Sequence, residues 1–64
     1  MTYTIKTNKQ KRTATIRVYE GRELIAKYQT CPFSVEDFKT VSHWTEGDIK
    51  NFLRYEDGSY FKVK

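Results

Sequence analysis

The spacing of apolar residues changes once along this chain, at Cys31-Pro32, and this change limits the fold more than any other feature. Before it, apolar and polar residues alternate with a period of two, as in β-strands that bury one face. After it, apolar residues recur three and four positions apart, as in amphipathic helices. Strands followed by helices predict an α+β domain, with two layers and the helices packed on one face of an antiparallel sheet.

Three strands are predicted in the first thirty residues, at Thr2–Thr7, Thr13–Tyr19 and Glu23–Thr30. They are rich in β-branched and aromatic residues, which favour strands. The polar loop Asn8–Arg12 separates the first two, and Gly21 supplies a positive φ angle for a tight turn between the second and third. Pro32 ends the third strand because proline cannot donate to a strand ladder.

Two short helices are predicted next, at about residues 35–42 and 46–55, with a break around His43-Trp44. Ser34 and Thr45 are the expected caps, because each is followed three positions later by an acidic residue. One continuous helix is the alternative, in which Gly47 would cost about 1 kcal/mol relative to alanine.

A last strand is predicted from Ser59 to Lys64, after a turn at Asp57-Gly58. An alternative pairs residues 51–55 with residues 60–64 as a hairpin. The helix is preferred because Ile49, Phe52 and Leu53 fit a period of 3.6 better than a period of two. The predicted order is therefore β-β-β-α-α-β in a single domain, 1–64.

Alternation also assigns the side chains of each strand to two faces. One face is apolar and must be covered by the helical stripe. The expected core is Ile5, Ile16, Val18, Leu24, Ala26, Phe38, Val41, Ile49, Phe52, Leu53, Phe61 and Val63. The other face is expected to be open and to hold Thr2, Thr4, Lys6, Thr13, Thr15, Arg17, Tyr19, Ile25, Lys27, Gln29, Tyr60, Lys62 and Lys64.

Charge is distributed unevenly between the two halves of the chain. The whole sequence has 12 Lys and Arg against 8 Asp and Glu, a net charge of +4. The seven bases and two acids of residues 1–28 contrast with the five bases and six acids of residues 29–64. The basic excess therefore belongs to the sheet and to the Asn8–Arg12 loop, and it suggests a polyanionic partner.

We therefore interpret the open face as a candidate nucleic-acid-binding surface. Four basic residues would contact phosphates from the strands: Lys6, Arg17, Lys27 and Lys62. Four more would reach from the loops: Lys9, Lys11, Arg12 and Arg22. Two aromatic residues, Tyr19 and Tyr60, would stack on unpaired bases. Threonine and lysine are also the usual residues of a solvated sheet face, so the composition alone does not decide between the two interpretations.

The sequence offers little for catalysis. Cys31 and His43 are its only cysteine and histidine, and nothing in the pattern places them together as a nucleophile and its base. The number of ligands is too small for a zinc site, and three isolated glycines make no phosphate loop. We therefore expect that the protein is not an enzyme and that it binds no cofactor or metal. A single cysteine permits no internal disulfide, which is typical of a reducing compartment, so a cytoplasmic location is expected.

The strand–turn–strand of Thr13–Thr30, with Arg17 and Lys27 directed outward, resembles in outline the three-stranded DNA-binding modules at the start of some phage and transposon integrases. The resemblance implies DNA binding by the sheet. Separately, the small size and basic charge of the 64-residue chain are typical of the accessory proteins that phages and mobile elements encode. The predicted fourth strand departs from that pattern, and no functional residue is carried over. The alternative is a protein-interaction or structural subunit without catalytic activity, using its surplus of aromatic residues or a sheet edge.

Overall fold

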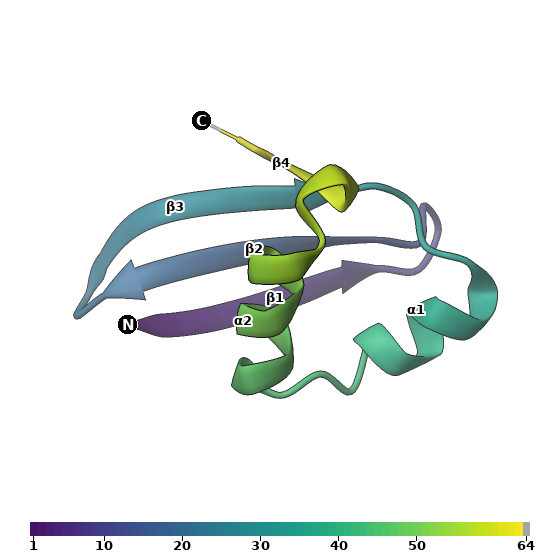
Figure 1. Cartoon of the computed structure of the whole chain (residues 1–64), viewed down its shortest axis with the longest axis horizontal. Coiled ribbons are helices and arrows are strands. Elements are labelled where there is room, and N and C mark those ends of the chain that lie inside the picture. The colour runs from purple at the N-terminus through teal and green to yellow at the C-terminus, as the bar shows by residue number, and fades with distance from the viewer. Residues whose placement is uncertain (64) are drawn as a thin grey trace.

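The computed structural model describes residues 1–63, which form one antiparallel sheet and two helices (Figure 1). The strands lie side by side in chain order: β1 (Thr2–Asn8), β2 (Thr13–Glu20), β3 (Glu23–Thr30) and β4 (Tyr60–Lys62). Between β3 and β4 the chain forms α1 (Val35–Val41), α2 (Glu46–Tyr55) and the 3₁₀ turn η1 (Asp57–Ser59). The predicted α+β class and the order β-β-β-α-α-β are confirmed.

The strands β1, β2 and β3 form two antiparallel hairpins that share β2. β1 pairs with β2 from Thr2 opposite Tyr19 to Asn8 opposite Thr13. Gly21 has a φ of 62°, a left-handed conformation that glycine adopts without strain, and it closes the β2–β3 turn. Residues 51–55 belong to α2, as predicted, and β4 pairs with β3, so the alternative hairpin of residues 51–55 with the last strand is ruled out.

Each helix begins at a side-chain cap. The Ser34 hydroxyl accepts a hydrogen bond from the Asp37 amide at 3.2 Å. Thr45 and Asp48 form a capping box, in which each side chain accepts from the other residue's backbone amide, at 3.3 and 3.0 Å. Such caps satisfy amides that have no partner inside the helix, so two separate helices form rather than one. No helix in residues 1–63 is long and apolar enough to span a membrane.

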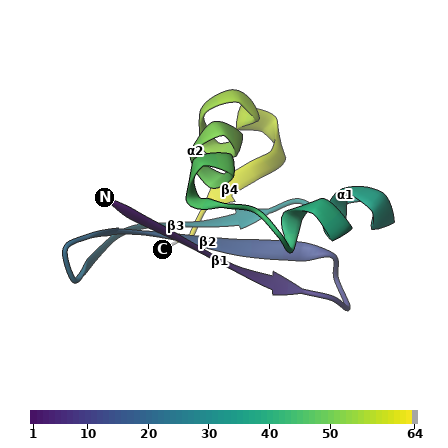
Figure 2. The same ribbon diagram turned by 90° about the horizontal axis from the view of Figure 1, so that it is seen from below.

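Both helices lie on one side of the sheet, as Figure 2 shows. Ile16 and Val18 of β2 pack beneath Ile49 and Phe52 of α2, and all four are buried. Partly buried neighbours surround this cluster: Tyr3, Ile5, Ala26, Tyr28, Phe33, Trp44, Leu53 and Tyr60. Val41 of α1 and Ala14 of β2 are also buried. Within residues 1–63, no element covers the opposite face of the sheet.

The expected side-chain phase of the last strand is wrong. Tyr60 lies opposite Thr30, and Lys62 lies opposite Tyr28, whose ring packs on the core. Tyr60 and Lys62 therefore share the helix-covered face, whereas Phe61, opposite Gln29, is on the open face and is 56% exposed. Val63 follows β4; its amide donates a hydrogen bond to the Lys27 carbonyl at 2.8 Å, and the residue is half-buried and not part of the buried core. Lys64, which the prediction included in the strand, is outside the described residues.

A shift of register in the β2–β3 hairpin moves another expected core residue. Val18 pairs with Ala26, but the next residue, Tyr19, pairs with Leu24, so Ile25 is an extra residue in β3. Such a bulge reverses the parity of the strand beyond it. Leu24 therefore shares the open face with Tyr19 and is 47% exposed, while Ile25 lines the helix side together with Ala26.

Candidate nucleic-acid interface

The open face of the sheet carries three basic side chains in adjoining positions. Arg17 of β2 lies between Thr4 of β1 and Lys27 of β3 in one cross-strand row. Lys6 of β1 belongs to the next row, two residues away along the strands. Standard sheet spacings put neighbouring positions of this kind about 5 to 8 Å apart. The three cations can therefore contact successive phosphates of one chain.

Arg17 and Lys27 are directly opposite each other on paired strands. Like charges in this position repel, and the sheet would be more stable with an opposite charge at either residue. The only acidic residues in the described strands are Glu20 and Glu23, which pair with each other at the end of the hairpin next to the turn. An anion bound across this face would reduce the repulsion.

The side chains around the three basic residues on this face include polar and aromatic ones. The Thr15 hydroxyl donates a hydrogen bond to Gln29 Oε1 at 3.0 Å across β2 and β3. Tyr19 lies on one side of the Arg17–Lys27 row, and Phe61 lies beside Gln29 on the other side. Tyr19 and Phe61 are four residues apart along the strands and two strands apart, roughly 16 Å by standard spacings.

The loop between β1 and β2 extends the basic surface at one end. Asn8 Oδ1 accepts hydrogen bonds from the amides of Gln10 and Lys11, at 3.0 and 3.2 Å, which turns the chain back on itself. Arg12 then adopts a φ of 53°, a conformation that costs a non-glycine residue on the order of 1 kcal/mol or more. Lys9, Lys11 and Arg12 are all exposed on this loop.

Not every predicted contact residue belongs to this surface. Lys6, Arg17, Tyr19 and Lys27 are on the open face, and Lys9, Lys11 and Arg12 adjoin it at the loop. Arg22 is at the opposite end of the sheet, in the β2–β3 turn. Tyr60 and Lys62 were placed here by simple alternation, and the register of β4 moves both to the other face.

Phe61 is the residue that the sequence analysis missed. Alternation predicts Phe61 and Val63 on the apolar face, with Tyr60 and Lys62 on the open face. A tyrosine, however, has a large apolar ring and buries it readily when its hydroxyl finds an acceptor. The available signal was therefore the ambiguity of Tyr60 in a strand of only three residues.

The two side chains considered for nucleophilic chemistry lie on different connecting segments. Cys31 is exposed after β3, and His43 is exposed after α1. Within residues 1–63, no three His, Cys, Asp or Glu side chains are grouped so that they could hold a metal ion.

No protein-family model matches the chain, and searches of curated proteins and of solved structures found no match. The resemblance to integrase DNA-binding modules gains no support from these searches and stays a prediction.

Proposed function

We propose that the open sheet face binds single-stranded nucleic acid through its phosphates, without strong sequence preference. The observation that carries this proposal is the facing pair Arg17 and Lys27, two like charges held opposite each other between the aromatic rings of Tyr19 and Phe61. Basic grooves that track the backbone, with aromatic rings that stack on bases, are the usual means of binding single strands.

Single strands suit this face better than a duplex. Duplex readers insert a helix or a two-stranded ribbon into the major groove, and both helices here lie on the far side of the sheet. Flat aromatic side chains stack most readily on bases that are unpaired and splayed out. Phe61, at 56% exposed, is available for such stacking without disturbing the core.

The charge layout sets the expected strength and salt dependence. Between three and six basic residues would contact phosphates, counting Lys6, Arg17, Lys27 and the Lys9–Arg12 loop. For single strands, the logarithm of the binding constant should then fall with the logarithm of salt concentration with a slope of roughly −2 to −4. Affinity should be modest, with a Kd of about 10⁻⁴–10⁻⁶ M at physiological salt.

The direct experiment is a fluorescence-anisotropy titration of labelled oligothymidylate and oligouridylate, roughly twelve nucleotides long, against matched duplex. We expect saturable binding to the single strands at about 50 mM salt, lost progressively as salt is added. Absence of binding to every probe at that salt concentration would refute the proposal. Preference for the duplex would refute the single-strand assignment.

A charge reversal separates binding from stability. Lys27→Glu places an acid directly opposite Arg17, so the free energy of unfolding should rise by about 0.2–1 kcal/mol. Binding should weaken at the same time, because one phosphate contact is lost and a repulsive charge is added. Denaturant unfolding and anisotropy on the same preparation measure both quantities. Undiminished binding by Lys27→Glu, or by Arg17→Glu with Lys27→Glu, would refute the site.

A further inference from the structure

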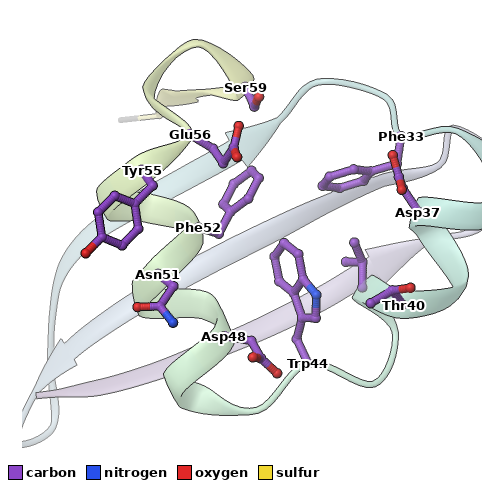
Figure 3. Close-up of a pocket in the computed structure, with 11 residues that line it drawn as sticks. Phe33, Asp37, Thr40, Trp44, Asp48, Asn51, Phe52, Tyr55, Glu56 and Ser59 are labelled. Carbon is purple, nitrogen blue, oxygen red and sulfur yellow. The ribbon is translucent and has the colours of Figure 1, made fainter.

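A groove of about 500 Å³ lies between α1 and α2, on the side of the molecule opposite the open sheet face (Figure 3). Its floor is made by the rings of Phe33, Trp44 and Phe52. Thr40 and Val41 of α1 form one wall, and Asn51 and Tyr55 of α2 form the other. The groove is separate from the proposed nucleic-acid site.

The aromatic floor is held in place by ring-to-ring packing. Trp44 and Phe52 have ring centroids 5.0 Å apart, and Phe33 meets Trp44 edge-to-face at 6.1 Å. Phe52 is buried, whereas Phe33 and Trp44 each keep part of their surface exposed toward the groove. Aromatic surfaces of this kind bind apolar groups and also attract cations.

Charge makes the groove selective. Among residues 1–63, three carboxylates line it, from Asp37, Asp48 and Glu56, and no lysine or arginine does. In Figure 3 these three side chains stand around the edge of the aromatic floor. The protein has 12 bases and 8 acids, so a groove lined by acids alone runs against the overall charge. Its complement is a cationic ligand with an apolar part.

We propose that this groove docks a basic segment of a partner protein, with two cationic side chains on either side of an apolar one. Asp48 and Glu56 are eight positions apart along α2 and its C-terminal end, roughly 12 Å at helical rise. Cationic residues four positions apart in an extended segment are separated by about 13 Å. The apolar residue between them then faces Trp44 and Phe52.

The test uses the intrinsic fluorescence of Trp44, the only tryptophan. The probe is an amidated, acetylated peptide, Arg-Ala-Leu-Ala-Arg, and its acidic counterpart is Glu-Ala-Leu-Ala-Glu. We expect a saturable fluorescence change with the basic peptide only. The double variant Asp37→Asn with Glu56→Gln removes one proposed partner of the peptide, Glu56, and a second carboxylate at the groove edge, and it should weaken that binding by roughly three- to tenfold. Asp48 is left unchanged because it caps α2.

A matched control is Glu20→Gln with Glu23→Gln, which removes the same charge at the β2–β3 turn and should leave peptide binding unchanged. Equal binding of the acidic peptide, no saturation with the basic one, or equal weakening by both double variants would overturn the proposal. If spermidine binds as tightly as the peptide, the apolar contact is not used. If the protein forms a concentration-dependent dimer that the groove variant abolishes, the occupant is a second copy of the chain. Both outcomes contradict a partner-protein segment.

Discussion

The Tyr60 side chain joins β4 to α2. Its hydroxyl donates a hydrogen bond to the Leu53 carbonyl, and its ring packs against Tyr28 and Phe52, with centroids 5.2 and 5.6 Å away. Burial and the nearby Asp57 carboxylate raise the pKa of the Tyr60 phenol above its usual value of 10.0. One residue thus secures the short C-terminal strand and titrates abnormally.

Removing the Tyr60 hydroxyl should cost stability only while the wild-type phenol is protonated. Near neutral pH, Tyr60→Phe should lower the free energy of unfolding by about 1 kcal/mol. Because folding raises the pKa of Tyr60, the wild type has its full excess stability over Tyr60→Phe below about pH 10. This difference in unfolding free energy is lost as the pH rises through the pKa of Tyr60 in the folded protein. Urea unfolding at a series of pH values measures this, and a constant gap between the two proteins up to about pH 11.5 would contradict it.

At the scale of elements, α2 depends on its capping box. Thr45 and Asp48 satisfy each other's backbone amides at the start of the helix, and α2 packs on β1. Thr45→Ala should therefore lower the free energy of unfolding by about 1 kcal/mol. Thermal unfolding followed by circular dichroism provides the measurement. Thr45→Ser keeps the acceptor and should retain most of the stability, so equal losses in both variants would argue against the cap.

The helices and the first hairpin pair could be predicted from the sequence because their signals are local. Ser34 and Thr45 mark helix starts within three residues, and seven-residue β1 alternates long enough to fix its faces. The phase of β4 could not be predicted, because three residues give little alternation and Tyr60 fits either face. The bulge between Val18 and Tyr19 moves the Leu24 side chain to the open face. It arises from the pairing of β3 with β2, which the local sequence pattern does not encode.

The candidate site also contains residues that local signals predict and residues that depend on strand pairing. Lys6, Arg17 and Lys27 could be grouped in advance because β1, β2 and the inner part of β3 keep regular alternation. Phe61 could not, since its place depends on β4. The helix-side groove was equally hidden, because Asp37, Asp48 and Glu56 come together only when α1 and α2 pack.

At the scale of the whole molecule, a small core supports two chemically different surfaces. Phe52 belongs both to this core and to the floor of the groove, since its ring packs against Phe33, Trp44 and Tyr60 and is only 8% exposed. Phe52→Ala should cost about 3–5 kcal/mol, most of the stability that a chain of this size is expected to have. Tyr55→Ala, on the same helix but 70% exposed, should change stability by under about 0.5 kcal/mol. Similar melting of Phe52→Ala and wild type would show that Phe52 is not a core residue.

The most direct test of nucleic-acid binding by the open face compares two lysines on opposite faces of one sheet. Lys6 and Lys62 are both exposed, and the register puts only Lys6 on the open face. We expect Lys6→Ala to reduce the salt slope for oligothymidylate binding by about 0.7, and Lys62→Ala to leave it unchanged. Equal effects of the two variants, or a larger effect of Lys62→Ala, would contradict binding by this face.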